Sequence, residues 1–279
     1  MKILITGISG FLGRNLIKKF NHHELFGLDI QEDTIDGVKV FSSSTLEKLD
    51  LNVDVVIICH AAVASGTVVL SNNLLFDVNV SLTEKIVNKF KDAFVVYVST
   101  ASIYDINLDL VYENSTINPQ SQYAISKFWA EKVVLNNKKS AIIRLSSLYG
   151  IGMKENTLIP NYINQALMNK SIQVWGTGSR LQNYVHVDDI ANYIFLIIEN
   201  QQKFYGELFL GVSKKEYSNL QIAEIIATIT NVEITFVNED KSKSFCYNNE
   251  YSTGLLNWEP ETTIENSLQN YIEWKQKKY

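Results

Sequence analysis

Cysteine is scarce in this sequence, and its two cysteines stand far apart. Cys59 and Cys246 are the only cysteines among 279 residues, and neither belongs to a CxxC or other metal-ligand spacing. This excludes a disulfide framework and favours reduced, structural thiols.

Clusters of basic residues are also lacking, and the net charge is −5. Because nucleic-acid binding needs a basic footprint, we expect small-molecule partners and no nucleic acid.

Long apolar runs are absent as well. No stretch approaches the roughly 20 apolar residues that a membrane helix needs. The N-terminal MKILITG enters a strand pattern directly, without the charged and apolar regions of a secretory signal. We therefore expect a cytoplasmic protein that does not interact with membranes. There are three prolines and no low-complexity linker, so any two lobes should be packed together.

The first half of the chain contains a regular alternation of short apolar runs and amphipathic stretches. Runs such as VVIIC and FVVYV are hydrophobic at nearly every position, as expected for strands covered by helices on both faces. Strands alternating with helices predict βαβ units and a parallel sheet. After Gly150 this rhythm loosens. We predict an α/β, doubly wound Rossmann domain over residues 1–148 and a smaller substrate-binding lobe over 149–279, with about 183–212 returning to the first domain.

A glycine-rich turn follows the first predicted strand. Residues 7–13 read GISGFLG, and this spacing allows a tight turn and a close approach of the backbone to a pyrophosphate at a helix N-terminus. Glycines alone would also fit a plain structural turn, but the strand–turn–helix context favours a dinucleotide. The residues assigned to the cofactor here are Gly7, Gly10, Phe11, Leu12 and Gly13.

An aspartate ends the second predicted strand. The carboxylate of Asp29 can accept hydrogen bonds from both ribose hydroxyls of NAD, whereas it would repel the 2′-phosphate of NADP. The residues that follow, Ile30, Gln31 and Glu32, offer no cation for that phosphate. NAD is therefore favoured over NADP, against the alternative that Asp29 is only a solvated strand end. Asp29 and Ile30 are assigned to the cofactor site.

A tyrosine, a lysine and a threonine hydroxyl suggest acid–base chemistry. Tyr123 and Lys127 stand four residues apart in a predicted helix, so both project from one face. An ammonium beside a phenol lowers the pKa of the phenol by favouring the phenolate. Thr100 ends a predicted central strand, which is where open α/β sheets bind their ligands. A YxxxK spacing is common on ordinary helices, but its combination with GISGFLG is more specific.

These motifs together resemble the extended short-chain dehydrogenase/reductase family, in particular its NAD-dependent nucleotide-sugar epimerases and dehydratases. The resemblance extends over essentially the whole chain and includes the motifs HAA at 60–62, FDVNV at 76–80, RLSSLYG at 144–150 and GTGSRLQNYVHVDDIA at 176–191. It implies that Thr100, Tyr123 and Lys127 are the catalytic residues and that Lys127 also holds the nicotinamide ribose. The further cofactor contacts that it implies are His60, Ala61, Ala62 and Asn79.

Positions 101 and 102 narrow the chemistry that this resemblance implies. Sugar 4,6-dehydratases have Asp-Glu immediately after the catalytic threonine, the related decarboxylases have glutamate at the second position, and GDP-fucose synthases have cysteine there. This sequence has Ala101 and Ser102, which disfavours all three reactions. What remains is hydride transfer at C4 with Tyr123 as the proton acceptor, either for 4-epimerisation or for reduction of a 4-keto sugar.

The substrate implied by the resemblance is a nucleotide-diphosphate sugar, and here the sequence departs from the family pattern. Ser147 stands where asparagine is common, and Gln182 stands where a phosphate-binding arginine is common. Arg180, two residues earlier, offers a cation for the diphosphate. The substrate residues that we expect are Ser65, Ser147 and Arg180. Neither the nucleotide nor the sugar follows from these residues.

The group His186, Asp188 and Asp189 has residue types that bind metals. The commoner explanation is that an aspartate caps a helix beginning at Ile190, so we expect no metal site.

The leading hypothesis is an NAD-dependent nucleotide-sugar 4-epimerase similar to UDP-glucose 4-epimerase. The alternative is an NAD(P)H-dependent 4-keto-6-deoxysugar nucleotide reductase. A third possibility is a non-catalytic NAD-sensing regulator, although such a protein would be expected to lose the tyrosine or the lysine. The resemblance further implies a homodimer through the helix that bears Tyr123, and a role in polysaccharide biosynthesis.

Overall fold

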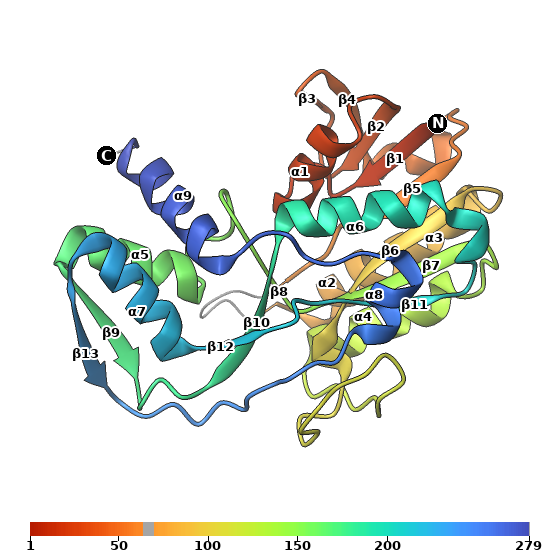
Figure 1. The fold of residues 1–279 in the computed structure, drawn as a ribbon. Helices are drawn as coiled ribbons and strands as arrows, with labels where there is room; N and C mark the ends of the chain where they lie inside the picture. The colour runs from red at the N-terminus through yellow and green to blue at the C-terminus, as the bar shows by residue number, and fades with distance from the viewer. Residues whose placement is uncertain (64–69, 279) are drawn as a thin grey trace.

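The computed structural model describes residues 1–63 and 70–278 and is built around an eight-stranded sheet (Figure 1). Its strand order is β11-β7-β6-β5-β1-β2-β4-β3. The strands are β1 (Lys2–Thr6), β2 (Glu24–Asp29), β3 (Asp33–Ile35), β4 (Val38–Ser42), β5 (Val55–Ile58), β6 (Phe94–Thr100), β7 (Ser140–Leu145) and β11 (Leu208–Gly211). All neighbours are parallel except β3, which runs antiparallel to β4. The predicted doubly wound α/β fold is confirmed. In the strand order, β2, β4 and β3 lie on one side of β1, whereas the later strands β5, β6, β7 and β11 lie on the other side. Open α/β sheets bind ligands at such a switch point.

Helices cover both faces of this sheet. One face packs against α1 (Phe11–Lys19) and α6 (Val187–Glu199), and the other against α3 (Leu82–Lys89) and α4 (Gln122–Val134). In β1, Ile3 and Ile5 belong to the core shared with α1 and α6, whereas Leu4 belongs to the core shared with α3 and α4. Because side chains alternate between the faces of a strand, a sheet buried on both faces needs apolar residues at every position.

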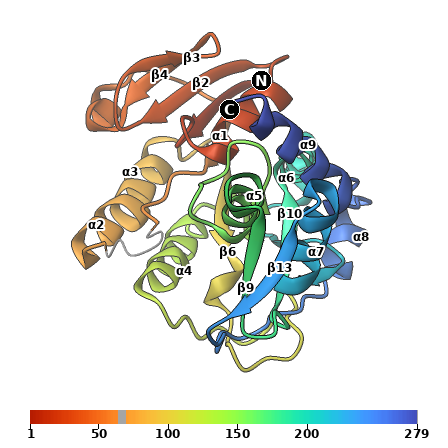
Figure 2. The same cartoon turned by 90° about the vertical axis from the view of Figure 1, so that its left-hand side faces the viewer.

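A smaller lobe stands beside the sheet domain (Figures 1 and 2). Its core is formed by α5 (Leu158–Asn169), α7 (Asn219–Thr230), α9 (Ile264–Gln276) and the two-stranded sheet of β9 (Ser171–Trp175) and β13 (Glu233–Val237). A three-stranded sheet is made by β8 (Ser147–Tyr149), β10 (Leu181–His186) and β12 (Glu216–Ser218). The shorter elements are α2 (Asn72–Phe76), η1 (Ser43–Lys48), η2 (Asp77–Ser81), η3 (Ala101–Ile103), η4 (Gln201–Lys203) and α8 (Glu250–Leu256).

The chain passes between the sheet domain and the lobe several times. Helix α6 lies against α1, and β11 pairs with β7 at the edge of the large sheet. Helix α8 also packs against β11 and α6, which the sequence did not suggest. Its Ser252 N–H donates to the Glu113 carboxylate at 3.2 Å, and Trp258 packs edge-on against Tyr193 of α6. The C-terminal part of the chain therefore contributes to both bodies, and the boundary at residue 148 stays a prediction.

The start of α6 differs from the expectation. The helix begins at Val187 rather than Ile190, and its N-cap is His186, whose Nδ1 accepts the Asp188 N–H at 3.3 Å. The prediction of an aspartate cap is wrong because Asp189 is used elsewhere. Its carboxylate accepts the N–H groups of Glu261 and Thr262, both at 3.2 Å.

Within residues 1–63 and 70–278, no group of three or more His, Cys, Asp or Glu side chains is arranged to hold a metal ion. No helix in the same ranges is both long enough and apolar enough to span a membrane.

Candidate cofactor and substrate site

The glycine turn between β1 and α1 leaves no room for side chains. Gly7 has φ +65°, and a Cβ there would lie 2.7 Å from the Cα of His60. A Cβ on Gly13 would lie 2.5 Å from the Gly7 carbonyl oxygen. Gly10 is the N-cap of α1, and the first turn of this helix has no acidic side chain. The turn therefore presents a helix N-terminus without a competing carboxylate, which suits an anionic ligand.

A cavity of about 290 Å³ lies beside this turn. Among its lining residues are the predicted Gly7, Gly10, Asp29, Ile30, His60 and Ala61. The other lining residues were not assigned to the cofactor from the sequence; they are Thr6, Ser9, Leu28, Ser43, Cys59, Val78 and Leu82. The sequence could have indicated them only through their location, because most of them are next to a predicted cofactor residue in the chain. Leu12 and Gly13 are buried behind the turn instead, and Phe11 lies against Gly150.

The carboxylate of Asp29 is fixed at the edge of this cavity by the glycine turn. Its Oδ2 accepts the N–H of Ser9 at 3.0 Å and the Ser9 hydroxyl at 2.7 Å. Its Oδ1 accepts the N–H of Ile30 at 2.8 Å. Since each carboxylate oxygen has two lone-pair positions, Asp29 retains acceptor capacity for further hydroxyl groups. Asp29 is therefore a positioned side chain rather than only a solvated strand end.

His60 links three elements at the inner end of the cavity. Burial, followed by the charge of Lys127, lowers the pKa of His60 to about 3, so the ring is neutral. Its Nε2 lies 3.1 Å from the Val78 carbonyl oxygen, which can only accept, so Nε2 carries the proton. Nδ1 then accepts the Thr6 hydroxyl at 2.7 Å. The ring thus ties the ends of β1 and β5 to the π-helical turn η2.

Asn79 does not line the cavity but connects its wall to the helix of Tyr123. The side-chain amide of Asn79 bonds Ala62 twice, accepting its N–H at 2.7 Å and donating to its carbonyl at 3.1 Å. It also donates to Ser126 Oγ at 2.9 Å, and Ser126 donates to the Tyr123 carbonyl at 2.8 Å. Asn79 is buried within η2. A single π-helical turn of this kind often occurs at functional sites.

The ammonium of Lys127 is held by the protein itself. Its Nζ donates to the Val98 carbonyl at 2.7 Å and lies 4.2 Å from the centre of the Tyr97 ring. Burial lowers the pKa of Lys127 to about 7, although the electrostatic effects of Cys59 and Glu131 act in the opposite direction. Tyr123, half-buried four residues before it, has its pKa raised to about 12 by burial. This direction is opposite to the shift expected from the neighbouring ammonium, because desolvation of the phenolate dominates.

A buried ion pair holds the same helix against the sheet. Glu131 of α4 receives two hydrogen bonds from Arg144 of β7, at 3.0 and 2.8 Å. Arg144 also donates to the Tyr104 hydroxyl at 2.8 Å and to the Glu113 carbonyl at 3.1 Å. Breaking such a pair by removing one partner costs several kcal/mol, because the other charge stays buried. The pair fixes α4, and with it Tyr123, relative to the end of β6.

Thr100 belongs to a second cavity, of about 210 Å³. It is the N-cap of η3, and its Oγ1 accepts the Ser102 N–H at 3.2 Å and lies 2.8 Å from Ser102 Oγ. The cavity is lined by Thr100, Ala101, Ser102, Leu145, Ser146, Ser147, Arg180, Leu181, Gln182, Asn183, Phe245 and Tyr247. The structure therefore brings the predicted Ser147 and Arg180 to Thr100, while the predicted Ser65 lies outside the described residues.

Phe245 and Tyr247 reach this cavity from a segment that carries no recognisable motif. Leu181 N–H donates to the Ser244 hydroxyl at 3.0 Å, and Val111 N–H donates to the Cys246 carbonyl at 2.9 Å. The segment thus bridges the lobe and the sheet domain. On the lobe side, Gln182 donates to Asn219 Oδ1 at 2.7 Å, so this amide is engaged with the lobe.

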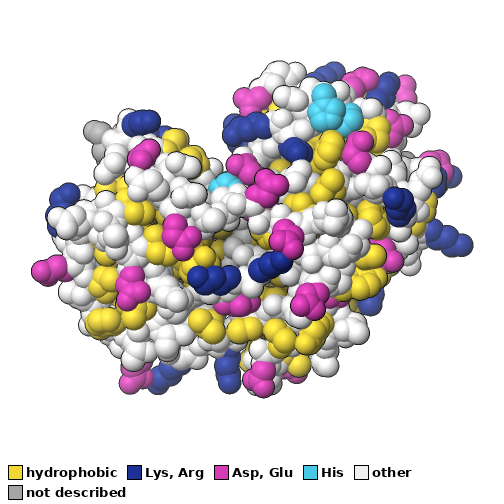
Figure 3. Space-filling model, viewed as in Figure 1, with side chains coloured by type: hydrophobic (Ala, Val, Ile, Leu, Met, Phe, Trp, Pro, Cys, Tyr) yellow, Lys and Arg dark blue, Asp and Glu magenta, His cyan; other side chains and the backbone are white. Residues whose placement is uncertain are grey.

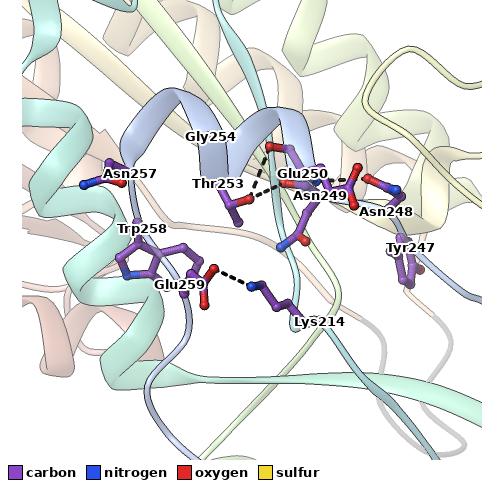
Figure 4. A pocket seen from close by; sticks show the side chains of 10 residues that line it. All are labelled: Lys214, Tyr247, Asn248, Asn249, Glu250, Thr253, Gly254, Asn257, Trp258 and Glu259. Carbon is purple, nitrogen blue, oxygen red and sulfur yellow. Dashed lines mark hydrogen bonds and ion pairs between the residues drawn. The ribbon is translucent and has the colours of Figure 1, made fainter.

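A further cavity, of about 570 Å³, lies beside α8 and is lined by none of the predicted site residues (Figure 4). An ion pair between Lys214 and Glu259 crosses it, and Thr253 bonds the carbonyls of Asn249 and Glu250. Tyr247 lines both this cavity and the one at Thr100. The surface on this side is hollowed between the lobe and the sheet domain (Figure 3).

Comparison with known proteins identifies the family. Residues 3–209 match the model of the NAD dependent epimerase/dehydratase family. The chain belongs to this family. The membership confirms the predicted resemblance and NAD as the cofactor, and it makes the protein an enzyme of the NAD-dependent epimerase/dehydratase type. The cavity beside the glycine turn fits this cofactor, because Gly10 opens the N-terminus of α1 without an acidic side chain in the first turn and Asp29 retains acceptor capacity.

Relatives of this family member have several activities. A dTDP-D-glucose 4,6-dehydratase of Dictyostelium discoideum is 27% identical over 82% of the chain, which spans 62% of that protein. A UDP-glucuronate 4-epimerase of Thermodesulfobacterium geofontis is 25% identical, with 97% of the chain and 95% of that protein covered. A GDP-6-deoxy-D-talose 4-dehydrogenase of Aggregatibacter actinomycetemcomitans is 30% identical, with 71% and 70% covered. The relatives therefore leave the individual reaction open.

A solved structure has the same fold. The protein MoeE5 in complex with UDP-glucose and NAD superimposes with a TM-score of 0.87, covers 100% of this chain and 99% of its own, and is 18% identical.

Proposed function

We propose that this family member is a nucleotide-sugar 4-epimerase that retains its NAD. The observation that carries the proposal is the wall of the cavity at Thr100. The two positions after Thr100 are Ala101 and Ser102, and the lining residues among those described include no carboxylate and no thiol. Elimination of water or epimerisation through a carbanion needs such an acid or base. The side chains of this wall therefore fit a reaction that transfers one hydride and one proton.

The catalytic roles that we assign to three side chains are those that the family resemblance implies. Tyr123, as the phenolate, takes the proton of the sugar hydroxyl at C4, and Thr100 hydrogen-bonds the same oxygen. Lys127, held by Val98 and Tyr97, supplies the positive charge that lowers the free energy of the phenolate. The chemistry that bound NAD would supply is acceptance of the hydride from C4 and its return to either face of the ketone. The buried pair of Glu131 and Arg144 keeps this helix in place during both steps.

The cofactor would be held by the glycine turn and Asp29, with the HAA segment lining the same cavity. Ala62 and Asn79 act from behind this wall through their mutual hydrogen bonds. The substrate diphosphate would be bound by Arg180, the cation among the described residues that line the cavity at Thr100. Ser147 would bind the sugar or phosphate through its hydroxyl. The names of the relatives support a UDP-, dTDP- or GDP-sugar.

The deciding experiment needs no added cofactor. The purified protein is denatured, and the released nucleotide is identified by mass spectrometry. The native protein is then incubated with UDP-glucose, UDP-glucuronate and dTDP-glucose, and the products are separated by chromatography. We expect bound NAD and conversion to the 4-epimer without external NADH. Stoichiometric NADH consumption with a 4-keto sugar nucleotide, and no epimerisation without it, would overturn the proposal.

The runner-up is a 4-keto-6-deoxysugar nucleotide reductase. It is supported by the 30% identity to the GDP-6-deoxy-D-talose 4-dehydrogenase and by the same absence of a carboxylate from the described wall at Thr100. A non-catalytic regulator would need none of the three catalytic side chains. Its decisive test is whether Tyr123→Phe leaves the cellular function intact.

We also propose a homodimer through the outer face of α4 and α2. Phe76, Ile125 and Trp129 are 42%, 41% and 53% exposed there, and the rings of Phe76 and Trp129 meet edge to face at 5.3 Å. Exposed apolar side chains in contact with one another are typical of an interface. Light scattering should give twice the chain mass for the wild type and a smaller mass for Trp129→Glu. A monomeric wild type at micromolar concentration would contradict this.

A further inference from the structure

We propose that Ser102 is a positioning residue that makes Thr100 a hydrogen-bond donor to the reacting C4 oxygen. The inference rests on the proposed function, because it concerns the oxygen from which Tyr123 takes the proton. Ser102 would thus have a role of its own, in addition to the fact that it is neither a carboxylate nor a thiol.

The hydroxyl of Thr100 has a limited capacity for hydrogen bonds. A hydroxyl has one proton to donate and two lone pairs that accept. One lone pair of Thr100 Oγ1 accepts the Ser102 N–H at 3.2 Å, because Thr100 caps η3. The Ser102 hydroxyl lies 2.8 Å from the same atom. If Ser102 donates, both lone pairs of Thr100 are occupied and its proton is free for the substrate.

The reacting oxygen selects this arrangement over the reverse one. While the sugar hydroxyl donates to Tyr123, its oxygen can only accept from any further partner, and the ketone oxygen that follows has no proton at all. A donor from Thr100 therefore matches the C4 oxygen before and after hydride transfer. In the reverse arrangement Thr100 would donate its proton to Ser102, and a lone pair of Thr100 would face a lone pair of the C4 oxygen. That contact is repulsive in a site shielded from water.

The surroundings of Ser102 leave its hydroxyl available for this task. Ser102 lines the cavity at Thr100 and is exposed to it. Its hydroxyl bonds no side chain among the described residues other than Thr100. The branched side chain of Thr100 is also stiff about χ1, so the pair of hydroxyls is held in one geometry by the backbone of η3.

A carboxylate in place of Ser102 would have the opposite effect. An ionised carboxylate only accepts hydrogen bonds, so it would attract the Thr100 proton and turn it away from the sugar. The two substitutions at position 102 should therefore differ in a way that a loss of packing would not explain. Ser102→Asp should impair the reaction more than Ser102→Ala, although aspartate is closer to serine in polarity.

The test is a double-mutant cycle on Thr100 and Ser102. We expect Ser102→Ala to lower kcat about fivefold, the value of one neutral hydrogen bond, with KM and bound NAD unchanged. Ser102→Thr should restore most of the loss. In a Thr100→Val background, Ser102→Ala should have no further effect, because a residue that acts only through Thr100 has nothing left to orient. Thermal melting of each variant verifies that it is folded.

Additive effects of the two substitutions, or an equal loss in Ser102→Asp and Ser102→Ala, would overturn the inference. The cycle is measured with the substrate that the wild type converts, by epimerisation or by reduction of a 4-keto sugar nucleotide. If the wild type only reduces, the proposed epimerase fails while the cycle still decides the role of Ser102. A wild type that catalyses neither reaction would overturn both.

Discussion

The proposed cofactor side and the proposed substrate side of this site are built in different ways. The cofactor cavity is made by the ends of β1, β2 and β5 with the turns that follow them, and its geometry is imposed by backbone atoms. Gly7 and Gly13 leave less than 3 Å for a side chain. The substrate cavity instead collects side chains from β6, β8, β10 and the segment at Tyr247. A cavity shaped by backbone atoms tolerates few substitutions, whereas a cavity lined by side chains can be changed by substituting one residue at a time.

The largest effect that we expect is a loss of kcat without a loss of cofactor binding. Tyr123→Phe removes the phenol that takes the proton, and general acid–base catalysis contributes about 10²–10⁴-fold. We expect kcat to fall by that factor while the amount of NAD that co-purifies stays the same, as measured by absorbance after denaturation. Equal losses of NAD and activity would mean that the two sides are not independent.

The next effect concerns the cofactor side alone. Asp29→Ala removes a carboxylate whose hydrogen bonds are worth about 1.5–3 kcal/mol each, so NAD affinity should fall by about 10- to 100-fold. Isothermal titration of NAD into the stripped protein measures this. Asp33→Ala, at an exposed position of β3, is the matched control and should leave the affinity unchanged. An unaltered affinity in Asp29→Ala would show that this carboxylate does not contact the cofactor.

Arg180→Ala tests the substrate side. Loss of one charge-assisted contact to a diphosphate should raise KM for the nucleotide sugar about tenfold, at little cost to NAD binding. Lys241→Ala is the control, because this lysine is exposed and forms an ion pair with the exposed Glu239. If the two variants give the same KM, the diphosphate is bound by other groups.

The smallest effect is a dependence of stability on pH. In the NAD-free protein the pKa of Lys127 is about 7, whereas the unfolded chain keeps its lysines protonated up to about 10.4. The unfolded state therefore binds more protons, and the free energy of unfolding rises with pH above 7. Between pH 7 and 8 we expect a gain of about 1 kcal/mol by urea denaturation. Lys127→Met should remove this slope, and a slope retained in that variant would refute the assignment.

The sequence could predict the cofactor side because its signals are local. GISGFLG, Asp29 and the HAA segment each adjoin a strand, and parallel strands bring their carboxyl ends to one edge of the sheet. The fold, the family and NAD are confirmed, while the roles of the individual residues stay predictions. Ser9 could have been found by the same logic, since it stands within the glycine turn.

The substrate side was less predictable because its contacts are long-range. Phe245 and Tyr247 reach the cavity through backbone pairing of their segment with Leu181 and Val111, and no local pattern encodes that pairing. The cap of α6 was mistaken for a similar reason. Asp189 looks like a helix cap in sequence, but it serves the N–H groups of Glu261 and Thr262.

The return of α8 and Trp258 to the sheet domain has a consequence for the order of folding. Trp258 completes the core between α6 and the sheet, and Ser252 binds Glu113. During synthesis the N-terminal strands emerge first, yet this part of their core is missing until α8 and Trp258 have also left the ribosome. The cofactor domain is therefore expected to remain a partly open intermediate during translation and to close, together with the lobe, in one late cooperative step.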